Sequence, residues 1–202
     1  MNNYQKTKII KHLHKFFHDE PTYIISQTDK NDFPITILLF EPNKDLPFWK
    51  FCTLGASNYK MENSTNKNLF NEYVMFVDKD EDLENNIQLR NWYMDMLSIP
   101  ARFPFETKNF LSYGHDIFIY SSNEEMVGVA LLLPEIIPDS RFLTCRINPF
   151  KKIYFFQVMP MTSIEKDILY NEGFKIFEKL FYPDNSDNFR PFAQQHRVFK
   201  DL

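Results

Sequence analysis

Two stretches of the sequence hold residue types that could carry out catalysis. In NFLSYGHDIFIY, Gly114, His115 and Asp116 stand directly before a β-like run. A histidine beside an aspartate could act in acid–base catalysis, bind a metal ion or mark a tight turn. In GASNY, Ser57 follows a strand-like run, as the nucleophile of a hydrolase does, but Tyr59 stands where that motif needs a second glycine.

A catalytic triad on Ser57 would need an acid such as Asp116 and a base such as His196. The chain order is right, but any chain of this length offers such residues. We therefore favour a serine that is hydrogen-bonded in a turn, and we predict no catalytic residue.

Metal and nucleotide chemistry find little support. His14 and His18 are four residues apart on a predicted helix and could face one ion, but no HExxH pattern or distant cysteine pair strengthens that idea. No Walker loop and no GxGxxG motif is present, so we predict no metal and no cofactor. Cys52 and Cys145 both lie in β-like runs, and we predict two buried free thiols.

The strongest electrostatic feature is an acidic run in DKDEDLE. It is formed by Asp78, Asp80, Glu81, Asp82 and Glu84. Such a run can be a solvated turn whose acids complement the start of the next helix. It can also steer a basic protein partner toward the chain, so we name these five residues as candidate partner-binding residues.

Composition limits the class of protein. With 44% hydrophobic and 25% charged residues in 202, the chain is expected to be globular. A net charge of −4 argues against nucleic-acid binding, because phosphates are repelled. The N-terminal stretch has no signal-peptide core, and the longest apolar run, VGVALLL, is too short to span a membrane. We therefore expect a soluble, cytoplasmic protein that does not bind membranes.

The pattern of apolar residues predicts helices and strands in both halves of the chain. Helices are expected over residues 3–18, around Leu89–Leu97 with a stop at Pro100, and from a capping box at Thr162 and Glu165 onward, where Gly173 should weaken the helix only modestly. The strand candidates are TYIISQT, PITILLFEP, FWKFCTLG, NEYVMFV, IFIY, VGVALLL, FLTCRI and IYFFQVMPM. The succession of the first four, up to NEYVMFV, looks like a meander and favours antiparallel pairing. The apolar VGVALLL suits a strand covered on both faces.

The chain is expected to form one domain over residues 1–183, followed by a tail over residues 184–202 that is docked or mobile. In that tail Phe189, Phe192, Val198 and Phe199 are the residues expected to dock.

Four stretches occur in an order that resembles the Suppressor of fused domain family: CTLGASNYKM, ARFPFETKNFLSYGHDI, VGVALLLPE and IYFFQVMPMTSIEKDILYNEGF. Family members carry a T-x-G-x-S stretch followed by Met, a loop with a proline and a Gly-His pair, a strand ending Leu-Leu-x-Pro, and a strand running into Pro-x-Thr-x-x-Glu. The matching residues are Thr53, Gly55, Ser57, Met61, Pro104, Gly114, His115, Leu132, Pro134, Pro160, Thr162 and Glu165.

The resemblance implies an α/β (α+β-like) domain with a central mixed, largely antiparallel sheet and helices packed around it. It implies no known catalytic residues, so Gly55, Ser57, Gly114 and His115 are interpreted as structural motif residues. Gly114 would let the chain turn sharply, and the His115 side chain would tie loop carbonyls in place.

The resemblance also implies a protein partner. Animal members bind an extended segment between this domain and a second one, so that binding mode is not carried over to this chain. Compact bacterial relatives resemble immunity proteins or antitoxins, which favours a non-catalytic protein that neutralises a basic toxin domain by direct binding. The alternative is a general adaptor that grips an extended peptide segment of a partner. The sequence does not predict the oligomeric state.

Overall fold

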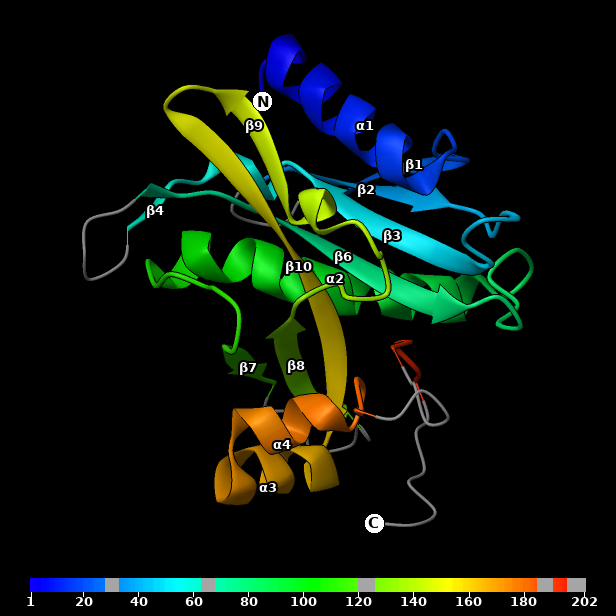
Figure 1. Ribbon diagram of the computed structural model, residues 1–202, viewed down its shortest axis with the longest axis vertical. Helices are drawn as coiled ribbons and strands as arrows, with labels where there is room; N and C mark the ends of the chain where they lie inside the picture. Colours follow the sequence, from blue (N-terminus) through cyan, green and yellow to red (C-terminus); the bar gives the residue numbers. More distant parts are fainter. Residues whose placement is uncertain (28–32, 63–67, 120–125, 185–190, 196–202) are drawn as a thin grey trace.

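One mixed sheet organises the molecule. The computed structural model describes residues 1–27, 33–62, 68–119, 126–184 and 191–195. Within these ranges eight strands form a sheet in the order β1-β2-β3-β6-β10-β8-β7, with β9 paired to β10 beside that path, and β4 and β5 form a small separate pair (Figure 1). The sheet is not closed, and helices pack around it, which confirms the predicted fold class.

Every predicted strand is present. The bounds are β1 (Tyr23–Gln27), β2 (Ile35–Phe40), β3 (Phe48–Leu54), β4 (Met61–Glu62), β5 (Asn68–Leu69), β6 (Asn71–Asp78), β7 (Asp116–Phe118), β8 (Met126–Leu132), β9 (Thr144–Asn148) and β10 (Lys151–Thr162). Two short 3-10 helices, η1 (Ala56–Asn58) and η2 (Ser140–Leu143), lie in the connections.

Helix α1 (Asn3–Phe17) covers one face of the sheet. The side chain of Asn2 caps its start by accepting a hydrogen bond from the backbone N–H of Gln5, and His18 ends it in a left-handed conformation with φ 58°. Its apolar stripe includes Ile9 and Leu13, both fully buried against β2, β3, β6 and β10. The helical spacing of the apolar residues therefore predicted both the helix and its buried face.

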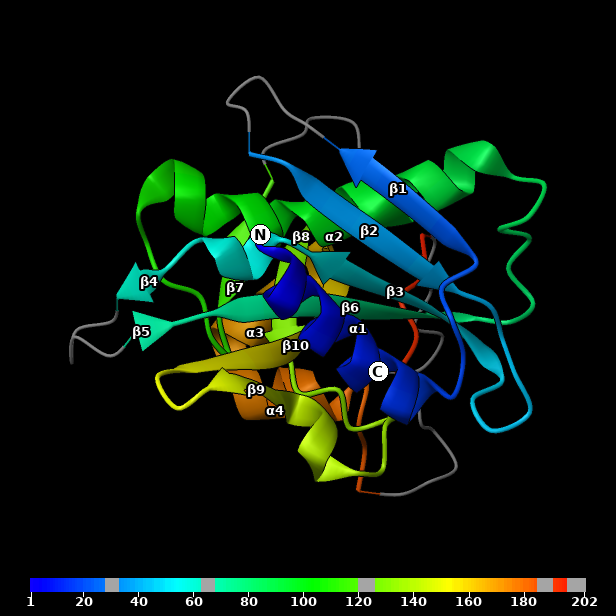
Figure 2. The same ribbon diagram turned by 90° about the horizontal axis from the view of Figure 1, so that it is seen from above.

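Helix α2 (Ile87–Thr107) covers the opposite face of the sheet (Figure 2). Its predicted end at Pro100 is wrong, because the helix continues through Pro100 and Pro104 to a left-handed cap at Lys108. A proline inside a helix lacks the N–H for one hydrogen bond, and its ring crowds the carbonyl four residues earlier. Here Pro100, Ala101 and Pro104 are buried on the sheet side, and that burial offsets the lost bonds.

The start of α2 also differs from the prediction. Asn86 is the N-cap, and its side chain accepts a hydrogen bond from the backbone N–H of Leu89. No acidic residue lies in the first turn of α2. The acidic run therefore precedes the helix and does not complement its dipole from within.

The predicted third helix is divided in two. α3 (Ser163–Glu172) opens with the predicted capping box between Thr162 and Glu165. Gly173 then adopts φ 89° and ψ 165°, which ends α3, and α4 (Phe174–Lys179) follows. The expectation that Gly173 only weakens a continuous helix is thus wrong, since its backbone conformation is not helical.

The centre of the sheet holds a parallel pair. β10 runs parallel to β6, with Phe155 opposite Glu72, whereas the other strand pairs are antiparallel. The predicted antiparallel succession of the first four strand candidates is confirmed, since β1, β2, β3 and β6 pair antiparallel in that order. β10 instead returns to β6 in parallel, after α2, β7, β8 and β9 have come between the two strands. β8 is covered on both faces, as predicted: Val129 and Leu131 pack with the α2 cluster, and Ala130 and Leu132 pack with α3 and α4.

The described part of the tail lies against the sheet. The backbone N–H of Ala193 donates to the carbonyl of Phe76 over 2.8 Å, and the ring of Phe192 packs against that of Phe48. Phe189, Val198 and Phe199 fall outside the described residues. Cys52 and Cys145 are free and buried, as predicted.

Candidate partner-binding surface

The acidic run lies in the turn between β6 and α2, at the end of the sheet where β6 finishes (right side of Figure 1). Two of its carboxylates serve the turn itself: Asp78 accepts from the backbone N–H of Asp80 over 3.0 Å, and Asp82 accepts from that of Asn85 over 3.1 Å. The side chains of the other three acids form no hydrogen bond or ion pair with any described residue. These are Asp80, Glu81 and Glu84, and their charges therefore face solvent.

Strand register brings further acids to the same end of the sheet. Phe48 is opposite Asp78, so the β2–β3 loop, which carries Glu41 and Asp45, lies beside the acidic run. The turn between α1 and β1 is at this end as well, because Tyr23 is opposite Leu39. We call the whole set the acidic end; it comprises Asp19, Glu20, Glu41, Asp45, Asp78, Asp80, Glu81, Asp82 and Glu84.

The acidic end is built over a buried lysine. The side chain of Lys50 is fully buried, and its Nζ donates to the carbonyl of Glu41 over 2.5 Å and to that of Leu46 over 3.4 Å. Burial lowers the pKa of Lys50 to about 8, while the charges of Asp19 and Glu41 act in the opposite direction. Lys50 thus holds the β2–β3 loop through backbone carbonyls and leaves the exposed carboxylates free of direct contact with it.

A second polar cluster surrounds Glu72 and is closed to solvent. The carboxylate of Glu72 accepts from the hydroxyl of Thr53 (2.7 Å), the backbone N–H groups of Gly55 (3.0 Å) and Ser57 (3.1 Å), and the hydroxyl of Ser57 (2.6 Å). Gly55 has φ 132°, which a side chain would strain. Burial raises the pKa of Glu72, and the four donors act against that rise.

This cluster extends to the first helix and to β10. The Ser57 hydroxyl accepts from Nε2 of Gln5 over 3.0 Å, and Nζ of Lys151 donates to Oε1 of Gln5 (3.0 Å) and to the carbonyl of Ser57 (2.9 Å). The hydroxyl of Ser57 is fully buried between Glu72 and Gln5. The cluster therefore joins α1, the turn after β3, β6 and β10, which is a structural arrangement; His196 lies outside the described residues.

Sequence reasoning missed Glu72, Gln5 and Lys151. The sequence offered one signal for Glu72: it is a single acid directly before the apolar run YVMFV, in a chain whose T-x-G-x-S stretch supplies hydrogen-bond donors. The predicted succession made β3 and β6 neighbours, but it did not show that their register brings Glu72 to the donors of T-x-G-x-S.

The Gly114–His115 pair lies in the loop before β7. Gly114 has φ 83°, its N–H donates to the carbonyl of Leu131 over 3.0 Å, and the N–H of Leu131 donates to the carbonyl of His115 over 2.9 Å. The ring of His115 packs against Phe110 with centroids 5.1 Å apart. Backbone groups therefore fix this turn, whereas we expected the His115 side chain to do so.

His14 and His18 do not converge on one point. Nδ1 of His14 lies 3.3 Å from a carboxylate oxygen of Glu20, and Nδ1 of His18 lies 3.0 Å from one of Asp45. Among the described residues no group of three His, Cys, Asp or Glu side chains is placed to hold a metal ion. None of the described helices is long and apolar enough to cross a membrane.

Comparison with solved structures shows which known fold this chain shares. The structure matches that described as the Sufu–Fu complex with a TM-score of 0.63 at 15% identity, over 96% of this chain and 91% of that one. It matches a suppressor of fused homologue from Neisseria gonorrhoeae with a TM-score of 0.62 at 15% identity, over 96% and 95% of the two chains. The fold is thus that of these two structures, the first of which is of a complex.

The amino-acid sequence itself identifies the family. Residues 31–191 match the model of the Suppressor of fused protein (SUFU) family, so this chain belongs to that family, as the motif resemblance indicated. Drosophila Suppressor of Fused matches with a TM-score of 0.60 at 14% identity, over 94% of this chain and 50% of that chain. No curated protein sequence matches the chain.

Proposed function

We propose that this protein is a non-catalytic immunity factor that neutralises a basic toxin domain by binding to it directly. The observation that carries the proposal is the acidic end, where loops far apart in the sequence gather carboxylates on a family fold found in a protein complex. A basic partner would be drawn to this end by charge, which raises the rate of association more than the final affinity. The matched fold of a bacterial homologue supports the same proposal.

Only some of the acids suit a mutational test. Asp78 and Asp82 hold the turn through hydrogen bonds, so their replacement would also disturb the backbone. Asp80, Glu81 and Glu84 do not carry such bonds. The triple variant Asp80→Lys, Glu81→Lys, Glu84→Lys therefore changes charge with little change in structure.

The test measures association of the wild type and this variant with a captured basic partner, at low and moderate salt. We expect the variant to associate about tenfold or more slowly at low salt and to lose most of its salt dependence, because steering by charge is screened by ions. The control is Glu106→Lys, Asp167→Lys, Glu172→Lys, which reverses three exposed acids outside the acidic end, one on α2 and two on α3. Equal association rates for wild type, variant and control would remove the acidic end from the proposal.

A second candidate function is an adaptor that grips an extended peptide, and the open edge of β1 favours it. β1 pairs only with β2 among the described strands, and its segment YIISQ has no charged residue and no proline to block another strand. Ile24 on this strand is 60% exposed. In this case a short peptide cut from the partner should compete with the whole partner, whereas an immunity factor should need the folded toxin.

A further inference from the structure

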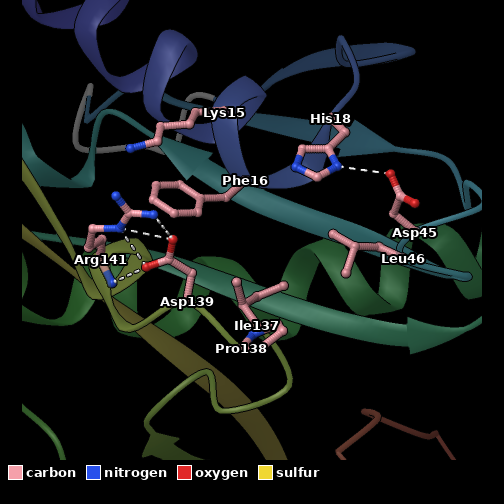
Figure 3. A pocket seen from close by; sticks show the side chains of 9 residues that line it. All are labelled: Lys15, Phe16, His18, Asp45, Leu46, Ile137, Pro138, Asp139 and Arg141. Carbon is pink, nitrogen blue, oxygen red and sulfur yellow. Dashed lines mark hydrogen bonds and ion pairs between the residues drawn. The ribbon is translucent and has the colours of Figure 1, made fainter.

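A preformed pocket lies beside the acidic end. It has a volume of about 500 Å³ and opens between the C-terminal end of α1, the β2–β3 loop and residues 137–141 (Figure 3). Phe16, Leu46, Ile137 and Pro138 give it an apolar lining. A volume of this order suits a large apolar side chain together with the groups next to it.

Hydrogen bonds hold the α1 and β2–β3 walls of the pocket together. Nδ2 of Asn43 donates to the carbonyl of Phe17 over 2.7 Å, and Oδ1 of Asn43 accepts from the backbone N–H of Leu46 over 2.8 Å. Lys50 fixes the same loop from the protein interior. These bonds place Leu46 and Asp45 on the pocket wall before any partner arrives.

The facing wall is tied in the same way. The carboxylate of Asp139 accepts from the backbone N–H of Arg141 over 2.9 Å. A ring nitrogen of His12, on α1, lies 2.9 Å from the carbonyl of Phe142, so the 137–141 segment is joined to the helix that it faces. A pocket whose walls are fixed in advance loses little entropy on binding.

The charged side chains of the pocket differ in how many hydrogen bonds and ion pairs they already form. Asp139 is bound by Nε of Arg141 over 2.9 Å and by Nη2 over 2.5 Å, and Asp45 is bound by His18 over 3.0 Å. Nη1 of Arg141 has no acceptor among the described residues. The Lys15 ammonium lies over the ring of Phe16, 5.0 Å from its centroid, and forms no ion pair with a described residue.

Figure 3 shows Lys15 and Arg141 on one side of Phe16 and the His18–Asp45 pair on the other. The carboxylates of Asp45 and Asp139 are thus already hydrogen-bonded. The two cations, Lys15 and Arg141, keep N–H groups that can donate to an anion. An apolar ligand that carries an anion on the Lys15–Arg141 side would satisfy both the lining and these donors.

We propose that this pocket receives, from the protein partner, a side chain of the size of Leu or Phe that adjoins a carboxylate. The inference deepens the proposed function and rests on its claim that the partner is a protein. Asp45 belongs both to the pocket and to the acidic end, so one partner surface can place its basic residues over the acidic end and this apolar anchor in the pocket.

Three short peptides test the chemistry: Ac-Gly-Phe-Asp-Gly-NH₂, Ac-Gly-Phe-Lys-Gly-NH₂ and Ac-Gly-Ala-Asp-Gly-NH₂. Each is titrated into the full-length ¹⁵N-labelled protein and followed by NMR. We expect the Phe-Asp peptide to shift the amide signals of residues 15–18, 45–46, 137 and 139–141, with an affinity at least about fivefold above those of the other two. Equal affinities, shifts confined to other residues, or no shifts at millimolar peptide would overturn the proposal.

Matched variants separate shape from charge. Pro138→Trp should fill the pocket from its exposed rim, and Pro149→Trp, in the exposed turn between β9 and β10, is its control. Lys15→Glu should repel the carboxylate, and Lys11→Glu, exposed on the same helix, is its control. Each test variant should weaken the Phe-Asp peptide by about tenfold while its control does not. Equal effects of a variant and its control would contradict the pocket assignment, and unchanged wild-type amide signals elsewhere would show that the fold is intact.

The same variants distinguish this inference from the proposed function. If a captured basic partner binds Pro138→Trp and wild type equally but is lost from the Asp80, Glu81, Glu84 reversal, the pocket assignment fails and the immunity proposal stands. If the Phe-Asp peptide binds the pocket but the protein captures no basic partner, the pocket assignment stands and the immunity proposal fails.

Discussion

Glu72 is a fully buried acid whose carboxylate accepts four hydrogen bonds. All four of its hydrogen-bond partners are donors: the hydroxyls of Thr53 and Ser57 and the backbone N–H groups of Gly55 and Ser57. An ionised carboxylate can accept from all of them, whereas a protonated one brings a donor of its own. Complete burial nevertheless favours the neutral form, and the pKa of Glu72 is raised.

The raised pKa of Glu72 makes a signed prediction. Since the folded state holds this proton more tightly than the unfolded state, the contribution of Glu72 to stability is full below its pKa in the unfolded chain and is lost as pH rises through its higher pKa in the folded state. The free energy of unfolding of wild type minus that of Glu72→Gln should therefore fall over this window and then level off. Urea unfolding at a series of pH values measures it. A difference that grows with pH would show that the four donors outweigh burial.

At this scale part of the cluster was predictable, but its centre was not. The family motif identified Thr53, Gly55 and Ser57 as a set. Their common acceptor is Glu72 on another strand, and only the pairing of β3 with β6 brings it to them. A motif records which residues occur together in one stretch, and it does not record a partner supplied by the fold.

Among the elements, the division between α3 and α4 depends on one backbone conformation. Gly173 has φ 89°, and a Cβ built there would meet no atom within 4 Å, so backbone strain and not crowding makes glycine the suitable residue. The ring of the next residue, Phe174, packs against that of Phe177. Phe177 is buried against Ala130 of β8 and Met159 of β10.

We predict that Gly173→Ala lowers the free energy of unfolding by about 1–3 kcal/mol, because alanine is strained at positive φ. Glu172→Ala, at an exposed helical position next to it, should change stability by less than about 0.5 kcal/mol. Thermal and urea unfolding of both variants measure the difference. If Gly173→Ala were more stable than wild type, α3 and α4 would be able to join into one helix and the two-helix arrangement would not be needed.

Helix and strand positions were predictable where periodicity alone decides them. The apolar spacing in α1 and the β-branched and aromatic runs of the strands fell close to their observed bounds. The end of α2 was not predictable, because the loss of hydrogen bonds at Pro100 and Pro104 is offset by packing on a sheet that the local sequence does not describe. The parallel pairing of β6 and β10 was not predictable either, because the local sequence does not show which distant strands become neighbours.

For the whole molecule, α1 is as much a part of the core as the sheet. The family match begins at residue 31, after α1 and β1, yet Ile9, Leu13 and Phe17 of α1 are fully buried against the sheet. Gln5 of the same helix binds the Ser57 hydroxyl, and Phe16 lines the pocket.

We predict that a chain lacking residues 1–20 loses cooperative unfolding, because one face of the sheet would be exposed. In the full chain Leu13→Ala should cost about 2–5 kcal/mol, and Lys11→Ala, exposed on the same helix, less than about 0.5 kcal/mol. Circular dichroism during urea unfolding measures all three. An unchanged unfolding midpoint after the deletion would mean that α1 is an accessory to the domain.

The acidic end also belongs to this scale. Five of its residues stood together in the sequence and were found there, whereas Asp19, Glu20, Glu41 and Asp45 come from two other turns that the sheet brings alongside. The negative charge of this surface was therefore predictable from the acidic run, but the contribution of the two other turns was not.

The parallel pair at the centre of the sheet also governs the order in which the molecule can assemble. β1, β2, β3 and β6 come from residues 23–78, and β7, β8, β9 and β10 from residues 116–162, so each half can pair largely through nearby segments. The long strands of the two halves are paired where residues 71–74 align with residues 154–157, a contact whose loop-closure cost slows its formation. Until it forms, the largely apolar strands β6 and β10 each keep an unpaired edge. The speed of that last joining step then decides how much newly made chain reaches the native state before aggregation captures it.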